Sequence, residues 1–180
     1  MIRLVFLMVL GGCLAVSGCV SETTSSALGE PPSPKPRRVS PAPQTAPIND
    51  IAMLKAMYPV DTNGNGYPNR LNVSVFLFAR PYPVPRFANG TLVFSLYPPS
   101  AYDRREGFGA DPIVEWRIDS QRMRGARFQN VVGQGYALSL DLAEFGITSL
   151  GYDSADLVTS FEPADGDLIV YGSSVQTITY

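Results

Sequence analysis

The chain contains no histidine and only two cysteines, and just 17% of its 180 residues are charged. Without histidine, Ser-His-Asp and Cys-His nucleophilic sites and His-ligated zinc or iron sites are excluded. The formal net charge of −2 argues against a nucleic-acid partner, which requires a concentrated basic surface. The sequence also lacks a Gly-x-Ser-x-Gly elbow and a phosphate-binding glycine loop. We therefore expect a protein that is not an enzyme and that does not bind nucleic acid.

Residues 1–18 show the order of features that is typical of a secretory signal peptide. Arg3 supplies a positive charge, residues 4–10 form an unbroken apolar run, and small residues follow. The apolar run is too short for a permanent membrane span, which needs about 20 residues. We therefore expect a signal peptide that is removed from the mature protein.

Residues 16–19, Val-Ser-Gly-Cys, resemble the lipobox of bacterial lipoproteins. The resemblance implies that Cys19 carries lipid, palmitate included, and becomes the mature N-terminus. Cys13 ends a similar junction, but cleavage there would leave a very short signal. Val20 after the cysteine fits sorting to the outer membrane better than retention at the inner membrane. The expected location is therefore the cell envelope, through a lipid anchor, and an ordinary soluble secretory signal is the alternative.

The segment from Cys19 to residue 47 differs in composition from the rest of the chain. It is first rich in Ser and Thr, and seven of the 16 prolines then lie between residues 31 and 47. A segment with so few apolar side chains cannot offset the entropy lost on folding. We therefore expect residues 19–47 to be a disordered tether with much extended polyproline II structure.

Residues 48–180 are expected to form one domain that begins with a short helix. The pattern predicts this helix over residues 50–58, where Asn49 or Asp50 would cap the first turn and Pro59 would end the last. Its apolar face would carry three residues at helical spacing, Ile51, Leu54 and Tyr58.

Beyond this helix, apolar residues recur at every second position, which is typical of half-buried strands. The alternation appears in seven segments: 71–80, 92–96, 114–118, 136–142, 157–161, 168–170 and 176–180. Gly, Pro, Asn and Asp separate the segments, so we predict an all-β antiparallel β-sandwich of about seven strands. In outline this resembles the immunoglobulin-like, C2-like and transthyretin-like modules of envelope proteins, with no pattern that selects one of the three.

The loop at residues 61–69 resembles the calcium loops of EF-hands, dockerins and thrombospondin-type repeats. Oxygen-bearing side chains occupy positions 1, 3, 5 and 9 of the loop, and glycine occupies position 6. The resemblance implies calcium ligation by Asp61, Asn63, Asn65, Asn69 and the backbone carbonyl of Tyr67. Only Asp61 is anionic, so calcium would bind weakly. The alternative is an Asn/Gly-rich turn held by hydrogen bonds from the backbone to side chains.

Three aromatic residues are candidates for ligand binding. Phe76 and Phe78 lie on the strand face opposite the aliphatic residues, and Trp116 lies in another alternating segment. Either the helix at 50–58 covers the two phenylalanines and Trp116 lies in the core, or the three rings form an exposed platform for sugars or a partner protein.

Two acidic pairs could form the carboxylate dyad of a glycosidase, Asp153 with Asp156 and Asp165 with Asp167. Both pairs lie in turn-forming sequence, where aspartate is favoured for local hydrogen bonds, and we assign no catalytic residue.

Together these features predict a lipid-anchored envelope protein that acts without catalysis. The leading hypothesis is a protein-interaction or structural accessory module with an envelope protein as partner. The alternative is a surface carbohydrate-binding module with a glycan as ligand and calcium as its only candidate cofactor.

Overall fold

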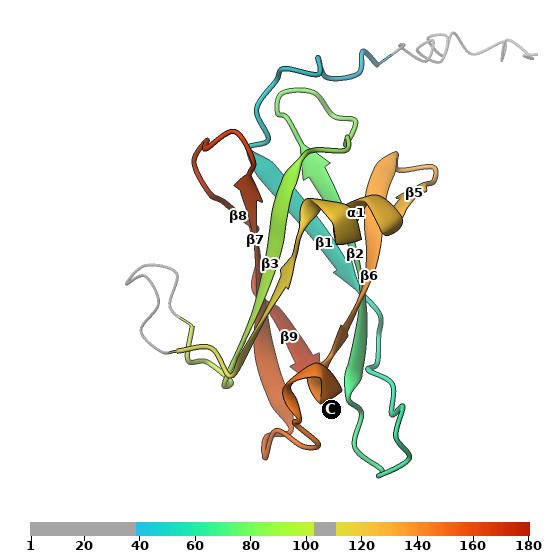
Figure 1. Cartoon of the computed structure of the whole chain (residues 1–180), viewed down its shortest axis with the longest axis vertical. Coiled ribbons are helices and arrows are strands. Elements are labelled where there is room, and N and C mark those ends of the chain that lie inside the picture. Colours follow the sequence, from blue (N-terminus) through green and yellow to red (C-terminus); the bar gives the residue numbers. More distant parts are fainter. Residues whose placement is uncertain (1–38, 103–110) are drawn as a thin grey trace, which may run out of the picture. The chain divides into compact units, whose positions relative to one another are not determined.

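The computed structural model describes residues 39–102 and 111–180 of the chain. The predicted signal peptide (1–18), Cys19 and the predicted tether up to residue 38 lie outside the described residues. The described part is mostly β-strand, in two antiparallel sheets that pack face to face (Figure 1). The predicted all-β sandwich is thereby confirmed, although the described residues form nine strands instead of about seven.

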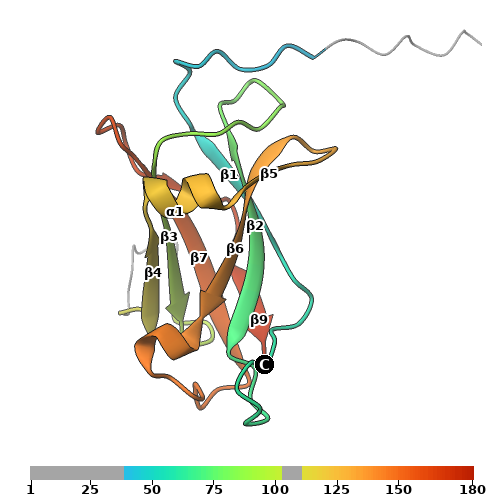
Figure 2. The same cartoon turned by 45° about the vertical axis from the view of Figure 1, so that its right-hand side comes forward.

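The two sheets differ in their strand order (Figure 2). Sheet A contains four strands in the spatial order β1 (Asp50–Lys55), β2 (Arg70–Phe78), β6 (Gln134–Asp141) and β5 (Arg127–Gln129). Sheet B contains β4 (Val114–Ile118), β3 (Gly90–Tyr97) and β7 (Ser154–Pro163), and the last of these pairs with both β8 (Val170–Tyr171) and β9 (Gln176–Thr179). Every strand pair is antiparallel.

The core lies between the sheets and is built by the predicted alternation. Sheet A contributes every second residue of β2, namely Leu71, Val73, Val75 and Leu77. Sheet B contributes every second residue of β3, namely Leu92, Phe94 and Leu96. Burial of one such side chain contributes about 1.5 to 3 kcal/mol, so this alternation is the main source of the stability of the domain.

The predicted helix over residues 50–58 is wrong, because this segment begins with β1. Ile51 and Met53 point toward the core, and β1 pairs along its whole length with β2. Leu54 and Tyr58, which the helix would have buried, are exposed. A helix of two or three turns is marginal alone, whereas β1 gains a complete hydrogen-bonded ladder.

Asn49 stabilises the start of the β1–β2 pair instead of capping a helix. Its Oδ1 accepts a hydrogen bond from the Arg80 N–H at 2.7 Å, and its Nδ2 donates to the Arg80 carbonyl at 3.1 Å. The side chain therefore mimics one more residue pair of the ladder.

Three short elements were not predicted. β5 has three residues, α1 (Ser120–Gly125) has six and the 3-10 helix η1 (Leu142–Phe145) has four. Asp119 caps α1, because its carboxylate accepts hydrogen bonds from the backbone N–H groups of Gln121 and Arg122. Elements of this length do not contain enough residues to show a period.

The loops gather at two ends of the sandwich (Figure 1). The upper end carries residues 39–49, the β2–β3 loop, the β5–β6 hairpin and the β7–β8 turn. The lower end carries the loop at 61–69, η1 and the C-terminal residue Tyr180.

Residues 42–47, which the sequence places in the tether, contact the domain at its upper end. Ala42 and Ala46 pack against the core. Arg86 donates to the carbonyl of Gln44 at 2.9 Å and also to the carbonyl of Ala46. The proline-rich chain is therefore attached to the sandwich before it enters β1.

Candidate functional site

The predicted site residues do not form one site. The loop at 61–69 lies at the lower end, Phe76 and Phe78 belong to β2 of sheet A, and Trp116 belongs to β4 of sheet B. Each group therefore has to be considered by itself.

The carboxylate of Asp61 organises the first half of the loop. Its Oδ1 accepts hydrogen bonds from the N–H groups of Asn63 (3.1 Å) and Gly64 (2.8 Å), and its Oδ2 accepts from the Gly66 N–H at 2.8 Å. The bond from Gly66 is the strongest influence on this group and lowers the pKa of Asp61 below its ordinary value of 3.8. Backbone donors therefore surround the one anionic group of the predicted calcium site.

The next residues of the loop repeat this arrangement. Asn63 Oδ1 accepts from the Asn65 N–H at 3.1 Å, and Asn65 Oδ1 accepts from the Tyr67 N–H at 2.8 Å. The ring of Tyr67 stacks on Tyr180 with 5.4 Å between the ring centroids. These are the side chain–backbone hydrogen bonds that the turn interpretation predicts.

Asn69 is 2% exposed, and its side chain forms its hydrogen bonds inside the protein, with Thr62 and Asp141. Its Oδ1 accepts two hydrogen bonds, from the N–H and the hydroxyl of Thr62 at 2.8 and 3.0 Å. Its Nδ2 donates to Asp141 Oδ1 at 3.0 Å. An amide oxygen has two lone pairs, and both are used here, so this geometry leaves none for a cation.

Asp141 is the partner that makes this arrangement possible. Its side chain accepts from Asn69, from the Arg70 guanidinium at 2.8 and 3.0 Å and from the Ala143 N–H at 2.9 Å. Its backbone carbonyl accepts from Trp116 Nε1 at 3.2 Å. Burial has the largest single effect on the pKa of Asp141 and raises it. The hydrogen bonds from Ala143, Arg70 and Asn69 and the charge of Arg70 all lower the pKa, and the net result is a pKa below 3.8.

Phe76, Phe78 and Trp116 are all buried, so they form no exposed platform, and Trp116 lies in the core as the other interpretation expected. The ring of Phe76 meets Phe128 edge to face, across Gly135, which has no side chain to separate them. The Arg80 guanidinium lies 4.4 Å from the centre of the Phe78 ring. Strand neighbours and loops therefore cover the two phenylalanines, in place of the predicted helix.

The two acidic pairs lie in different surroundings. The carboxylate of Asp156 accepts hydrogen bonds from the Ser100 N–H at 2.8 Å and the Thr177 hydroxyl at 2.9 Å, and it thereby holds β9 and the β3–β4 connection. Asp165 and Asp167 flank Gly166 in the exposed β7–β8 turn, where the positive φ of +82° suits glycine.

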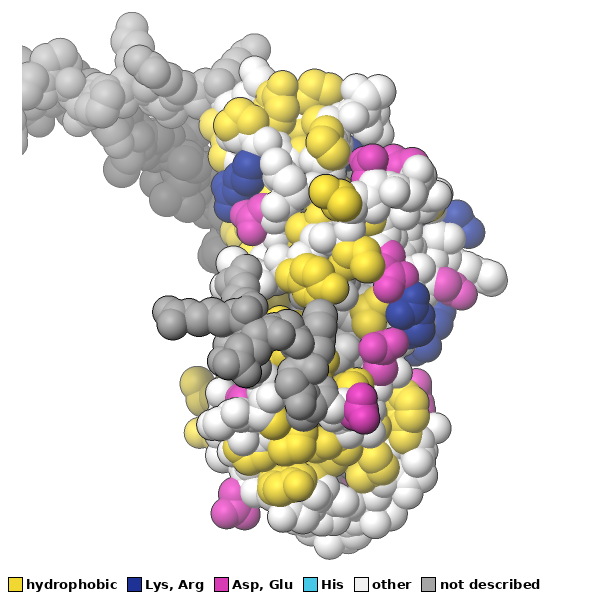
Figure 3. Space-filling view, turned by 90° about the vertical axis from the view of Figure 1, so that its left-hand side faces the viewer, with side chains coloured by type: hydrophobic (Ala, Val, Ile, Leu, Met, Phe, Trp, Pro, Cys, Tyr) yellow, Lys and Arg dark blue, Asp and Glu magenta, His cyan; other side chains and the backbone are white. Residues whose placement is uncertain are grey.

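An apolar groove of about 600 Å³ runs beside β8. Its lining, which we call the β8 groove, consists of Pro47, Ile48, Asn49, Asp167, Leu168, Ile169, Val170 and Tyr171. Leu168 is 90% exposed, and Ile169, Tyr171 and nearby Val175 are also exposed. Figure 3, which faces the side where β8 lies, shows hydrophobic side chains gathered in its upper part. Such a cluster of exposed apolar side chains is typical of an interaction surface.

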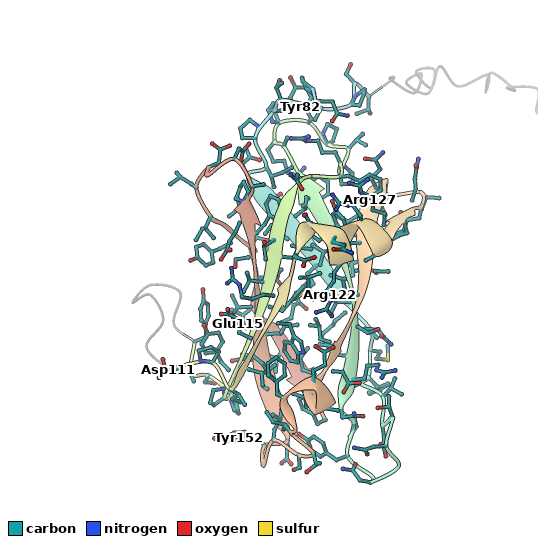
Figure 4. All side chains as sticks on the ribbon, viewed as in Figure 1. Tyr82, Asp111, Glu115, Arg122, Arg127 and Tyr152 are labelled. Atoms are coloured by element: carbon teal, nitrogen blue, oxygen red, sulfur yellow. The ribbon has the colours of Figure 1, made fainter. Side chains whose placement is uncertain are left out.

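A second hollow, of about 670 Å³, lies at the upper end and is called the end cavity here. Half of the residues that line it are polar: Gln44, Thr45, Arg86, Asn89, Arg127, Gln134, Asp165 and Asp167. Figure 4 shows Arg127 next to β5, near the upper end of the molecule. Its guanidinium lies 4.5 Å from the centre of the Phe87 ring.

Two kinds of site are not found within residues 39–102 and 111–180. No group of three or more acidic or cysteine side chains is placed to hold a metal ion. No helix in these ranges is long and apolar enough to cross a membrane.

Sequence reasoning missed both hollows. The alternation at residues 168–170 predicts that Leu168 and Val170 share one buried face, but β8 begins only at Val170 and Leu168 lies in the turn before it. A run of three aliphatic residues directly after the Asp-Gly-Asp turn was the available signal for the β8 groove. The end cavity combines residues from five distant segments, which no local pattern reveals.

No protein-family model, no curated protein and no solved structure matches this chain.

The lowered pKa of Asp141 predicts a loss of stability in acid. A carboxyl group whose pKa is lower in the folded chain than in the unfolded chain stabilises the fold at any pH above its pKa in the unfolded chain, here about 3.8. This stabilisation is lost as the pH falls from that value through the pKa of the folded state. We expect Asp141→Asn to lower the free energy of unfolding at pH 7 by about 1 to 3 kcal/mol. The variant should also show a smaller decline than the parent below pH 4, in urea titrations across that range. Some decline should remain, because the pKa of Asp61 is lowered too. If the free energies of unfolding of parent and variant declined in parallel below pH 4, Asp141 would not be the source of the decline.

The loop geometry predicts that calcium leaves the stability unchanged. The purified protein should melt at the same temperature in millimolar CaCl₂ and in EDTA, since a bound ion would raise the melting temperature by mass action. Asp61→Ala should lower the melting temperature in both buffers, because three backbone N–H groups lose their acceptor. A rise with calcium that Asp61→Ala abolishes would instead establish a calcium site.

Proposed function

We propose that this chain is a lipid-anchored cell-envelope protein that displays its β-sandwich as a non-catalytic interaction module. The lipobox-like residues 16–19 and the proline-rich segment that follows support the anchor, and Val20 after the cysteine supports its outer-membrane location. The absence of histidine from the sequence and the structural use of Asp141 and Asp156 support a role without catalysis.

The β8 groove is the observation that carries the interaction role. Leu168 is almost fully exposed although leucine is among the residues most often buried. It lies next to Ile169 and the buried Ile48 in the same groove. A partner that buried these exposed side chains would remove their apolar surface from water, which favours binding.

The charge of the groove defines the partner further. Asp167 is the one charged residue in its lining, and Asp165 lies two residues away. The complementary partner is an envelope protein that presents aliphatic side chains together with a nearby lysine or arginine.

The test is capture of the partner in cells by the full-length chain, crosslinked in place and carrying a tag after Tyr180, which lies at the opposite end from the groove (Figure 1). Mass spectrometry would identify bound proteins, bound glycans and the lipid on the Cys19 peptide. Leu168→Asp should reduce recovery of the partner about tenfold or more, since burial of a leucine contributes about 1.5 to 3 kcal/mol.

Val131→Asp is the matched control. Val131 is 104% exposed, at the tip of the β5–β6 hairpin and outside the groove, so this variant should recover the partner as the parent does. Equal recovery by the two variants would reject the β8 groove as the interface. Glycan without a protein partner would support the carbohydrate alternative, and an unmodified Cys19 peptide would reject the lipid anchor.

A further inference from the structure

The end cavity differs from the β8 groove in that opposite charges line it. It opens between the β2–β3 loop, β5, β6 and the β7–β8 turn, and residues 44–48 form part of its wall. Its volume of about 670 Å³ falls within the range of roughly 300 to 1,000 Å³ that is usual for small-molecule sites.

Two arginines form the cationic part of the lining. No ion pair among the described residues includes Arg86 or Arg127. Arg86 donates to two backbone carbonyls, and its Nε is buried with no hydrogen-bond partner in the described part of the chain. Its positive charge is therefore met by neutral acceptors only, which is an incomplete match for a partly buried guanidinium.

The position of Arg127 is fixed by an aromatic cluster. Its guanidinium packs on the Phe87 ring, and Phe87 packs edge to face on Tyr136 with 5.6 Å between the centroids. The Tyr136 hydroxyl accepts from the Ala88 N–H at 2.9 Å and donates to the Ala88 carbonyl at 3.1 Å. A guanidinium that stacks on a ring keeps its N–H groups in the plane, where they can bind a carboxylate.

Two aspartates form the anionic part of the lining. Asp165 and Asp167 come from the β7–β8 turn, whereas Arg86 and Arg127 come from the β2–β3 loop and β5. The described residues form no ion pair with either aspartate. The carboxamides of Asn89 and Gln134 also line the cavity, and they can donate or accept hydrogen bonds.

We infer that the end cavity binds a short zwitterionic peptide. The carboxylate of the ligand pairs with the exposed Arg127 guanidinium, on the side of the cavity where Arg86 adds a second positive charge, and its ammonium group pairs with Asp165 and Asp167. A ligand with negative charge alone would meet the two aspartates, and a cation alone would meet the two arginines. The end cavity shares Pro47, Ile48 and Asp167 with the β8 groove, so the inference concerns a second ligand whose site adjoins the proposed protein interface.

The test is isothermal titration of the purified full chain with tri-alanine, N-acetyl-tri-alanine and tri-alanine amide. Tri-alanine should bind, and loss of either terminal charge should weaken binding about tenfold or more, which corresponds to about 1.4 kcal/mol. Arg127→Gln and Asp165→Asn should each weaken tri-alanine binding to a similar extent. Both side chains are exposed, so the variants are expected to fold, which a melting curve checks.

Arg124→Gln is the matched control, because Arg124 is exposed on α1 and lies outside the cavity lining. It should bind tri-alanine as the parent does. No binding at millimolar tri-alanine, equal binding of the three peptides, or an equal effect of Arg124→Gln would each overturn the inference. Arg127 does not line the β8 groove, so partner capture by Arg127→Gln separates a failure here from a failure of the proposed function.

Discussion

The buried hydrogen bond from Asn69 Nδ2 to Asp141 Oδ1 connects parts of the chain that are far apart in sequence. Both residues are nearly removed from solvent, with 2% and 8% exposure, so their polar atoms must find partners inside the protein. Asn69 holds the loop at 61–69 through Thr62, and Asp141 starts η1 through the Ala143 N–H. The Asp141 carbonyl also accepts from Trp116 of sheet B. This side-chain pair therefore fixes the lower loops, and the backbone carbonyl of Asp141 links the two sheets.

This arrangement gives the two ends of the sandwich different properties. At the lower end the polar side chains of the loop satisfy one another and its backbone, and the loop holds its conformation through its own hydrogen bonds. At the upper end Arg86, Arg127, Asp165 and Asp167 form no ion pairs within the described residues, and Leu168 is exposed beside them. Charged side chains that form no ion pair within the described residues, and exposed apolar side chains, are available to other molecules. Both proposals accordingly concern the upper end, where the described chain begins at residue 39.

The sequence predicts those elements in which the period is long enough to be unambiguous. Six of the seven alternating segments lie mostly in strands, whereas the segment 168–170 contains only the first residue of β8. The three-residue β5 was not predicted. β1 was predicted as a helix because Ile51, Leu54 and Tyr58 also fit helical spacing, and only the pairing of β1 with β2 decides between the two. In the loop, the local hydrogen bonds of Asp61 follow from its sequence. The role of Asn69 does not, because its partner Asp141 lies 72 residues away. The β8 groove and the end cavity likewise depend on the packing of separate segments.

The most direct test of this account is a double-mutant cycle on Asn69 and Asp141, measured as free energies of unfolding in urea. Asn69→Ala and Asp141→Ala should each destabilise the protein, since each leaves a buried donor or acceptor without its partner. Because the two residues act as one unit, the double variant should be less destabilised than the sum of the single variants, by about 1 kcal/mol or more. Effects that add within about 0.5 kcal/mol would show that the two side chains act independently and would contradict the account.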